Sequence, residues 1–314
     1  MLDVITIGAA TVDIFIKSKK FVVKKDPEYL TGQSLSVAYS SKNEIDQSLI
    51  CSGGGATNAA VSFSRLELKS SCLSLIGDDP LSNYIYLDLS KNKVNRALLA
   101  TEHNTSDFSV IMIASDGGRT IFTNRGTTCL ENKHFHWSKL PLPQWFYITS
   151  LEGNLNLLEK IIGFAKENNI KISLNPGNRE LDQLKYLHPL IKQVDFLLLN
   201  KTEAQVLIKS TYDDPDFWQK LKSLGCPLIA VTKGRQGAHI LSVSGDYFSP
   251  IINTHPVDET GAGDAFGSTF VASLIHGNDI PTSLHWAIKN SASVVSNIGA
   301  KPGLLTLKQI THAS

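Results

Sequence analysis

One stretch of the chain combines glycines with an acid in a way that suits phosphoryl chemistry. Residues 258–274 read DETGAGDAFGSTFVASL. A turn of small residues that opens a helix presents free backbone N–H groups to one point, so we expect Gly261, Ala262 and Gly263 to bind an anion. Asp264 closes this turn and has two interpretations. It either caps the helix, or it accepts a proton beside a bound phosphate.

The spacing of the glycines argues against two common nucleotide-binding motifs. The chain contains no G-x-x-x-x-G-K-[ST], and Gly261, Gly263 and Gly267 follow G-x-G-x-x-x-G rather than the dinucleotide fingerprint. A nicotinamide-dependent oxidoreductase is therefore poorly supported. Phosphoryl transfer fits better, because amides can hold the transferred group while a carboxylate takes the proton of the attacking hydroxyl.

The composition is that of a globular protein with a small-molecule ligand. The 314 residues include 30 Lys and Arg against 29 Asp and Glu, so we expect no binding to nucleic acid or to a membrane surface by bulk charge. The four cysteines are widely spaced, which predicts reduced thiols. The sequence shows no signal peptide pattern and no apolar run of the ~18 residues that a membrane span needs. We expect a cytoplasmic protein.

Strands and helices must alternate to position the turn. Six apolar runs predict strands, at 3–8, 71–77, 145–151, 170–175, 195–200 and 227–232. The segments between the later runs have helical periodicity, which predicts parallel βαβ units with both sheet faces covered. Residues 237–243 and 246–252 predict an antiparallel addition. The expected fold class is α/β, with a central, mostly parallel sheet flanked by helices.

Two intervals depart from this alternation. Residues 14–52 and 107–125 are rich in β-branched residues and turn signals, and the second predicts a hairpin about Asp116-Gly117-Gly118. We expect both to supply strands to a small β-sheet lid over the main sheet. The chain, 1–314, is then a single domain with lid strands inserted. Free strand edges can pair between subunits, so a homodimer through the lid is one expectation.

Two signatures resemble those of a known family. DETGAGDAFGSTFVASL is similar to the carboxy-terminal signature of the ribokinase-like carbohydrate kinases, the phosphofructokinase-B family, and GGGATNAAVSFSRL at 53–66 is similar to their amino-terminal signature. Both occur in the family's order, and the resemblance covers essentially the whole chain. It implies a ribokinase-like fold and ATP-dependent transfer of the γ-phosphoryl group to a hydroxyl of a sugar, a pentose or a related one.

The resemblance implies catalytic roles for the matching residues. Asp264 is then the general base, and the amides of Gly261, Ala262 and Gly263 form the anion hole. Asn200 and Glu203 match the family's N-x-x-E and are expected to organise Mg²⁺, through water, and the ATP phosphates. The same pair has the form of a helix capping box, and both roles can coexist.

The resemblance also implies a nucleotide pocket. The residues expected there are Asn200, Thr232, Gly234, Gly237 and Asn290. Gly234 and Gly237 could equally be turn glycines between two strands. Asn290 could equally be a polar residue on a solvated helix face.

The acceptor is expected between the lid and the main sheet. Residues that match sugar-binding positions of the family are Asp13, Gly54, Gly55, Asn58 and Glu152. Carboxylates, an amide and bare glycine backbone suit hydroxyls, which both donate and accept hydrogen bonds. Thr11 and Gly55 replace an asparagine and a lysine found in relatives, and these changes leave the exact sugar open.

A monovalent-cation site and two rival functions complete the expectations. Asp258, together with backbone carbonyls near Thr260 and Gly299, matches the ligands of a cation site for K⁺, whereas Gly303 replaces a side-chain ligand. A nucleoside kinase of the adenosine type shares both signatures, and the long interval 14–52 keeps this alternative open. A non-catalytic sugar-binding protein on the same fold is less favoured, because Asp264 and its partners are intact.

Overall fold

The centre of the molecule is a nine-stranded sheet with the order β15-β14-β13-β12-β11-β10-β1-β6-β7. The computed structural model describes residues 2–29, 32–116 and 118–312. The strands of this sheet are β1 Val4–Ile7, β6 Ser70–Gly77, β7 Leu99–Glu102, β10 Trp145–Ile148, β11 Lys171–Leu174, β12 Phe196–Asn200, β13 Leu228–Thr232, β14 Ala238–Ser242 and β15 Gly245–Ser249. The seven strands β13, β12, β11, β10, β1, β6 and β7 pair in parallel, while β14 pairs antiparallel with both β13 and β15. The expected mostly parallel sheet is confirmed.

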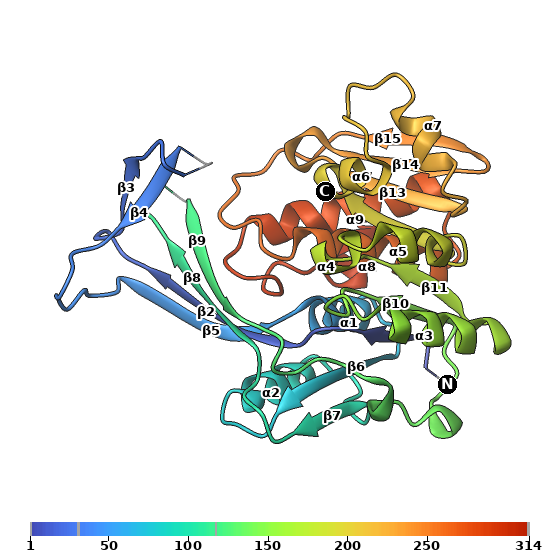
Figure 1. The fold of residues 1–314 in the computed structure, drawn as a ribbon, viewed down its shortest axis with the longest axis horizontal. Helices are drawn as coiled ribbons and strands as arrows, with labels where there is room; N and C mark the ends of the chain where they lie inside the picture. Colours follow the sequence, from blue (N-terminus) through green and yellow to red (C-terminus); the bar gives the residue numbers. More distant parts are fainter. Residues whose placement is uncertain (1, 30–31, 117, 313–314) are drawn as a thin grey trace.

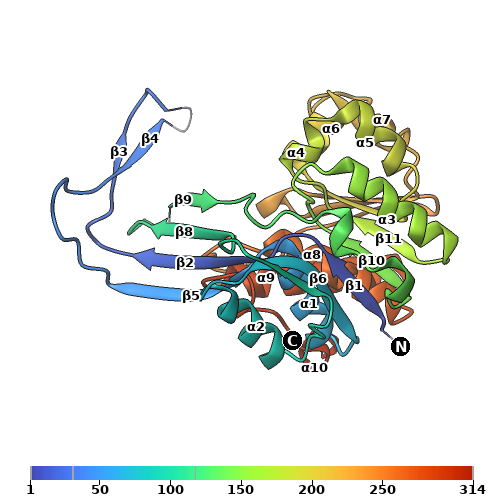
Figure 2. The same cartoon turned by 60° about the horizontal axis from the view of Figure 1, so that its bottom comes forward.

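Helices cover both faces of the sheet, as Figures 1 and 2 show. One layer contains α3 Leu155–Glu167, α4 Asn178–Leu181, α5 Leu184–Ile191, α6 Lys201–Ile208 and α7 Phe217–Lys222. The other contains α1 Gly55–Arg65, α2 Ser82–Lys91, α8 Ala262–Ile275, α9 Ile280–Val295 and α10 Leu307–Thr311. Each layer packs its own apolar core against the strands, which explains their continuous apolar runs. None of the described helices combines the length and the apolarity needed to cross a membrane.

A four-stranded sheet, here called the lid, projects from the main body. It has the order β5-β2-β8-β9 and comprises β2 Thr11–Lys17, β5 Gln47–Gly53, β8 Phe108–Ile113 and β9 Arg119–Asn124. The expected hairpin is β8 and β9, and its turn residue Gly117 lies outside the described residues. Part of the interval 14–52 does not join the lid, since β3 Val22–Lys25 and β4 Gln33–Ser36 form a separate two-stranded sheet.

The first lid strand begins earlier than the sequence predicted. β2 starts at Thr11 and pairs with β5 in the register Asp13↔Cys51. Asp13 therefore lies on a lid strand and not in the loop after β1. Its side chain is nevertheless buried, because β2 leaves the main sheet directly after β1.

Helix α8 lies close against the sheet because of a glycine. A Cβ at Gly267 would lie 2.3 Å from the Tyr147 hydroxyl oxygen and 2.5 Å from Leu198 Cδ2. The third glycine of the sequence motif therefore permits close packing between helix and strands. Phe266 and Phe270 are buried on the same helix.

Candidate active site

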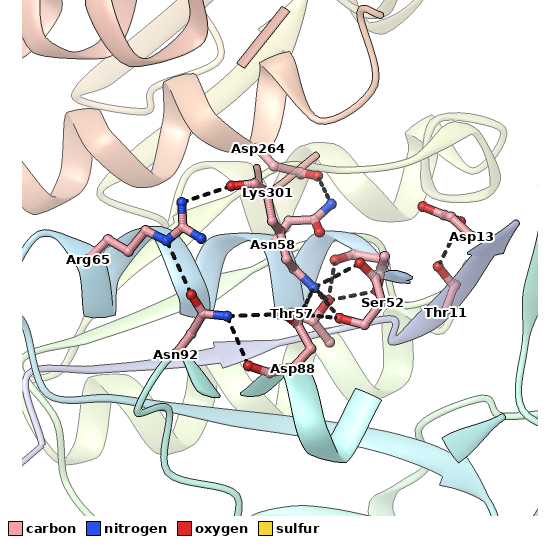
Figure 3. Close-up of polar contacts among 12 residues, drawn as sticks. Thr11, Asp13, Ser52, Thr57, Asn58, Arg65, Asp88, Asn92, Asp264 and Lys301 are labelled. Carbon is pink, nitrogen blue, oxygen red and sulfur yellow. Dashed lines mark hydrogen bonds and ion pairs between the residues drawn. The ribbon is translucent and has the colours of Figure 1, made fainter. Parts of the chain in front are cut away.

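Asp264 lies in the first turn of α8 but does not cap it. The N-cap residue is Gly261, in the left-handed conformation with φ 77°, and no side chain caps this end of the helix. Asp264 Oδ2 instead accepts a hydrogen bond of 2.8 Å from Asn58 Nδ2, as Figure 3 shows. The capping interpretation is therefore wrong. The carboxylate of Asp264 on α8 therefore points toward α1, the helix that carries the amino-terminal signature.

The surroundings of Asp264 favour a carboxylate that can accept a proton. Burial raises its pKa above the ordinary 3.8, and the nearby charge of Asp13 acts in the same direction. The hydrogen bond from Asn58 and the positive charges of Lys301 and Arg125 oppose this change without reversing it. A carboxylate with a raised pKa is a stronger base than an exposed one.

Asn58 leaves one acceptor atom unused beside this carboxylate, and the Asp13 carboxylate lies near enough to affect its pKa. Asn58 is buried, and within the described part of the chain its Oδ1 has no hydrogen-bond partner. Asp13 accepts a long bond of 3.4 Å from Thr11 Oγ1, and burial raises its pKa although a hydrogen bond from Ser109 opposes this. Buried acceptors of this kind call for donors, and the hydroxyls of a bound ligand would supply them.

Gly54 and Gly55 are required by packing at the start of α1. A Cβ at Gly54, where φ is 91°, would lie 2.5 Å from the Ala9 carbonyl oxygen. A Cβ at Gly55 would lie 2.9 Å from Thr149 Cβ. No larger side chain fits at either position without movement of the neighbouring strand ends. These contacts hold the amino end of α1, and with it Asn58, against the main sheet.

Glu152 lies after β10 and is less directly connected to this group. Its carboxylate pairs with Arg179 Nη1 at 3.2 Å, and its backbone has a left-handed φ of 56°. The buried Glu180 holds the loop by accepting hydrogen bonds from Leu151 N at 2.7 Å and Gly153 N at 2.9 Å. Among the described residues, no hydrogen bond joins Glu152 to Asp13, Asn58 or Asp264.

Sequence reasoning missed a buried lysine behind the site. Lys301 Nζ lies 2.9 Å from Asp88 Oδ2, 2.9 Å from Thr57 Oγ1 and 3.0 Å from the Ser52 carbonyl oxygen, and it also donates to Ser52 Oγ. Figure 3 shows its ammonium group among these partners. They belong to β5, α1 and α2, so one cation ties the lid to two helices. A single lysine in GAKPG carries no local pattern that could have identified it.

A cavity of about 540 Å³ lies beside the turn that opens α8. Its lining includes most of the expected nucleotide and anion-hole residues, namely Asn200, Thr232, Gly234, Gly237, Ala262 and Gly263. Apolar side chains complete the wall, among them Ile251, Ile252, Phe266, Ile288 and Val295. The volume and the mixed lining suit a ligand of nucleotide size.

The amides of the α8 turn are not equivalent. Ala262 N donates to the Glu259 carbonyl oxygen at 3.3 Å. In the described structure, Gly261 N and Gly263 N donate to no backbone carbonyl outside the helices. The first N–H groups of a helix have no partner within it. Gly261 and Gly263 therefore offer the freer donors for an anion.

Asn200 and Glu203 form a capping box at the start of α6. Asn200 Oδ1 accepts from Glu203 N at 2.9 Å, and Glu203 Oε2 accepts from Asn200 N at 2.8 Å. The box leaves the Asn200 amide group and the second Glu203 oxygen for other partners. Burial raises the pKa of Glu203, against the effect of its bond to the Asn200 backbone.

Asn290 lies in the core and not in the cavity. It is fully buried, donates to Thr269 Oγ1 at 2.6 Å and accepts from Leu305 N at 2.8 Å. The residues of α9 that line the cavity include Ser291 and Ala292 instead. The structure therefore supports neither of the two roles that the sequence suggested for Asn290.

Asp258, Thr260 and Gly299 come together, with hydrogen-bond donors directed at both oxygens of the Asp258 carboxylate. Asp258 Oδ1 accepts from Thr260 N at 3.0 Å and Thr260 Oγ1 at 2.7 Å, and Oδ2 accepts from Gly299 N at 2.9 Å. Arg119 Nη1 also lies 2.7 Å from Oδ1. Because donors and a guanidinium surround this carboxylate, the arrangement does not fit a bound K⁺.

Comparisons with known proteins agree with this geometry. The family model described as pfkB family carbohydrate kinase matches residues 2–307. A ribokinase of Schizosaccharomyces pombe is 25% identical, over 99% of this chain and 97% of its own. A putative ribokinase II of E. coli, solved in complex with ATP and Mg²⁺, superimposes with a TM-score of 0.81 at 20% identity, over 99% of this chain and 98% of its own.

A nucleoside kinase of Methanocaldococcus jannaschii has a similar fold. Its TM-score is 0.75 at 23% identity, over 98% of this chain and 97% of its own. Sugar kinases and a nucleoside kinase thus share the architecture described above. The chain belongs to the pfkB family of carbohydrate kinases, which are phosphotransferases with an alcohol group as acceptor.

Proposed function

We propose that this protein transfers the γ-phosphoryl group of ATP to a hydroxyl of a sugar, a pentose or a related compound. One observation carries the proposal. The Asp264 carboxylate, held by Asn58 at 2.8 Å, lies in the same helical turn as the free amides of Gly261 and Gly263, and the next residue toward the amino end from Asp264, Gly263, lines the cavity. A base and an anion-binding turn in one place are what transfer to an alcohol requires.

In the proposed mechanism, Asp264 accepts the proton of the acceptor hydroxyl. The Asn58 amide fixes the orientation of the Asp264 carboxylate, so the acceptor hydroxyl can approach it from one direction only. The amides of Gly261 and Gly263, with that of Ala262 beside them, stabilise negative charge on the transferred group. The positive end of α8 adds to this stabilisation.

The cavity is the proposed site of ATP. Thr232, Gly234 and Gly237 line one part of it, and Ala262 and Gly263 line another. Gly237 has φ 92°, and a Cβ there would lie 2.1 Å from the Ser249 carbonyl oxygen, so packing against β15 also requires this glycine. Gly237 can therefore be a turn glycine between two strands and line the cavity at the same time.

Asn200 and Glu203 are the residues that we propose to hold Mg²⁺. In the described structure, no group of three or more His, Cys, Asp or Glu side chains could bind a metal ion alone. Mg²⁺ is commonly bound through one or two carboxylates together with phosphate oxygens and water. Glu203 fits this pattern, because its capping bond uses only one carboxylate oxygen. When bound, the ion would neutralise phosphate charge.

The acceptor is proposed to bind where the lid meets the main sheet. Asp13 on β2 and the unpartnered Oδ1 of Asn58 can accept bonds from its hydroxyls, and Gly54 and Gly55 offer backbone beside them. We propose that Glu152 also belongs to this acceptor site. Closure of the lid over the acceptor would keep water from the transferred group.

The lid also supports a proposed homodimer. Leu49 and Ile50 on β5 and Ile121 and Phe122 on β9 are exposed apolar residues, and these two strands are the edges of the lid sheet. Edge strands of this kind can pair between copies. Light scattering of the purified protein would test this part of the proposal.

A panel of acceptors tests the function and its alternatives. ADP release from ATP would be measured with ribose, fructose, 2-keto-3-deoxygluconate, adenosine and cytidine. The proposal predicts the highest kcat/KM with a pentose or a related sugar. A preference for adenosine or cytidine would favour the nucleoside kinase alternative. Binding of sugars without turnover in the presence of ATP and Mg²⁺ would favour a non-catalytic protein.

A further inference from the structure

Arg119 joins the lid to the loop that precedes α8. It is the first residue of β9, and its Nη1 lies 2.7 Å from Asp258 Oδ1, with 32% of the Arg119 side chain and 2% of the Asp258 side chain exposed. Figure 1 shows the segment between β15 and α8 reaching toward β9. Among the residues described, this is the ion pair that links a lid strand to the body carrying the anion-binding turn.

The Asp258 carboxylate is saturated by donors. Its two oxygens accept bonds from Arg119, from the backbone and hydroxyl of Thr260, and from Gly299 N. A monovalent cation needs oxygen atoms turned toward it, whereas here N–H and O–H groups face the carboxylate. The guanidinium charge would also repel a cation placed against the same oxygen.

A buried carboxylate requires a positive partner or many hydrogen bonds to remain charged. Asp258 is 5% exposed, so its charge cannot be compensated by water. Arg119 supplies the positive charge from within the chain. Its planar guanidinium is well suited to pairing with a carboxylate at a partly buried site.

The pair bears directly on the geometry of the anion-binding turn. Asp258 holds Thr260, the residue before Gly261, and it holds Gly299, the residue before Ala300. A Cβ at Gly261 would lie 2.3 Å from Ala300 Cβ, so these two segments pack tightly. Through Asp258, the charge of Arg119 therefore supports the backbone that presents the amides of Gly261 and Gly263.

We propose that Arg119 takes the place of a monovalent cation at Asp258, so that K⁺ is not required for the activity of this protein. The proposal rests on the phosphotransferase function proposed above. Arg119 also lines the cavity proposed for ATP. At Asp258 we assign it a positioning role, in which it neutralises the carboxylate and thereby fixes the turn. Because Arg119 belongs to the lid, the position of the lid affects the geometry of the anion-binding turn.

Initial rates test the proposal. The wild-type protein would be assayed with its best acceptor in KCl and in choline chloride at equal ionic strength, together with Arg119→Met, Arg119→Lys and the control Lys17→Met. Lys17 suits as a control because it lies on β2 at the level of Arg119, through the pairs Lys17↔Ile113 and Ile113↔Arg119, and makes no ion pair in the described structure.

The expected results separate the positioning role from general damage. The wild-type rate should change by less than about twofold between the two salts, whereas Arg119→Met should lose about tenfold or more in choline chloride, because a displaced turn costs rate steeply. KCl should restore part of that loss, and Arg119→Lys should remain independent of K⁺. Lys17→Met should match the wild type. Severalfold activation of the wild type by K⁺, or an Arg119→Met rate equal to that of the wild type in choline chloride, would overturn the proposal.

Thermal unfolding provides a readout that does not depend on phosphotransfer. The Tm of the wild type should be the same in KCl and choline chloride, while the Tm of Arg119→Met should be lower in choline chloride and rise in KCl. A wild-type Tm that rises specifically with K⁺ would contradict the proposal even if no acceptor had been found. A protein inactive with every acceptor but with the expected Tm values would instead contradict only the proposed function.

Discussion

Asn58 and Asp264 lie 206 positions apart in sequence, yet Asn58 Nδ2 donates to Asp264 Oδ2 across 2.8 Å. Asn58 belongs to the amino-terminal signature on α1 and Asp264 to the carboxy-terminal signature on α8. The bond therefore joins the two segments by which the sequence resembles its family. It also directs the carboxylate away from the helix end that an aspartate at this position could have capped.

Replacing Asp264 with asparagine tests its role as a base. Asp264→Asn keeps the size of the side chain but removes its ability to accept a proton, so kcat should fall by about 10²- to 10⁴-fold. Sugar affinity, measured by calorimetry, should change little. The control Asp246→Asn alters an exposed aspartate that pairs with Lys222 and should leave kcat unchanged. Equal turnover of Asp264→Asn and wild type would exclude Asp264 from the mechanism.

The pH dependence of kcat/KM should report the raised pKa of Asp264. A general base works only when deprotonated, so activity should fall as the pH decreases through a pKa above the ordinary 3.8. Lys301 lowers this pKa by its positive charge, and its removal in Lys301→Met should therefore move the acid limb to higher pH. An acid limb that stays in place or moves to lower pH would contradict this assignment.

Replacing only Lys301 of the Lys301–Asp88 ion pair should lower the free energy of unfolding more than replacing both residues. Lys301→Met leaves the Asp88 carboxylate, of which 24% is exposed, without its cation, and should cost about 3 kcal/mol of unfolding free energy. The double variant Lys301→Met with Asp88→Leu should lose less. Urea unfolding of the single and double variants measures the difference, and additive losses would argue against the coupling.

Two glycines of the α8 turn should respond in opposite ways to alanine. A Cβ at Gly261 would lie 2.3 Å from Ala300 Cβ at a φ of 77°, so Gly261→Ala should destabilise the protein by about 1–3 kcal/mol. Nothing lies within 4 Å of a Cβ at Gly263, so Gly263→Ala should keep or slightly increase stability. Urea midpoints check both. Equal losses would contradict the open space described around Gly263.

Asn290 should affect stability and not nucleotide binding. Asn290→Leu leaves Leu305 N and Thr269 Oγ1 without their buried partner, at a cost of about 1–3 kcal/mol. The KM for ATP should stay close to the wild-type value. In contrast, Ser291→Leu narrows the cavity and should raise that KM. A raised KM in Asn290→Leu alone would return Asn290 to the nucleotide site.

The sequence predicted those features that depend on neighbouring residues. Continuous apolar runs such as Trp145–Ile148 predict strands covered on both faces, and they form the parallel sheet. Glycines in Thr260-Gly261-Ala262-Gly263 predict a turn with free amides, and the structure has one there. Local backbone preference and side-chain periodicity act over a few residues, so these elements can be inferred from the sequence.

Only the tertiary structure decided which distant side chains meet. Packing of α1 against α8 gave Asp264 its partner Asn58, packing of α9 buried Asn290, and the position of the lid brought Arg119 to Asp258. No local pattern distinguishes a lysine on the surface from Lys301, whose buried contacts come from three other elements. The sequence by itself determined the strands, the helices and the glycine turn, because these follow from short-range preferences. The charges and hydrogen bonds around that turn depend on long-range packing, and only the folded chain defines them.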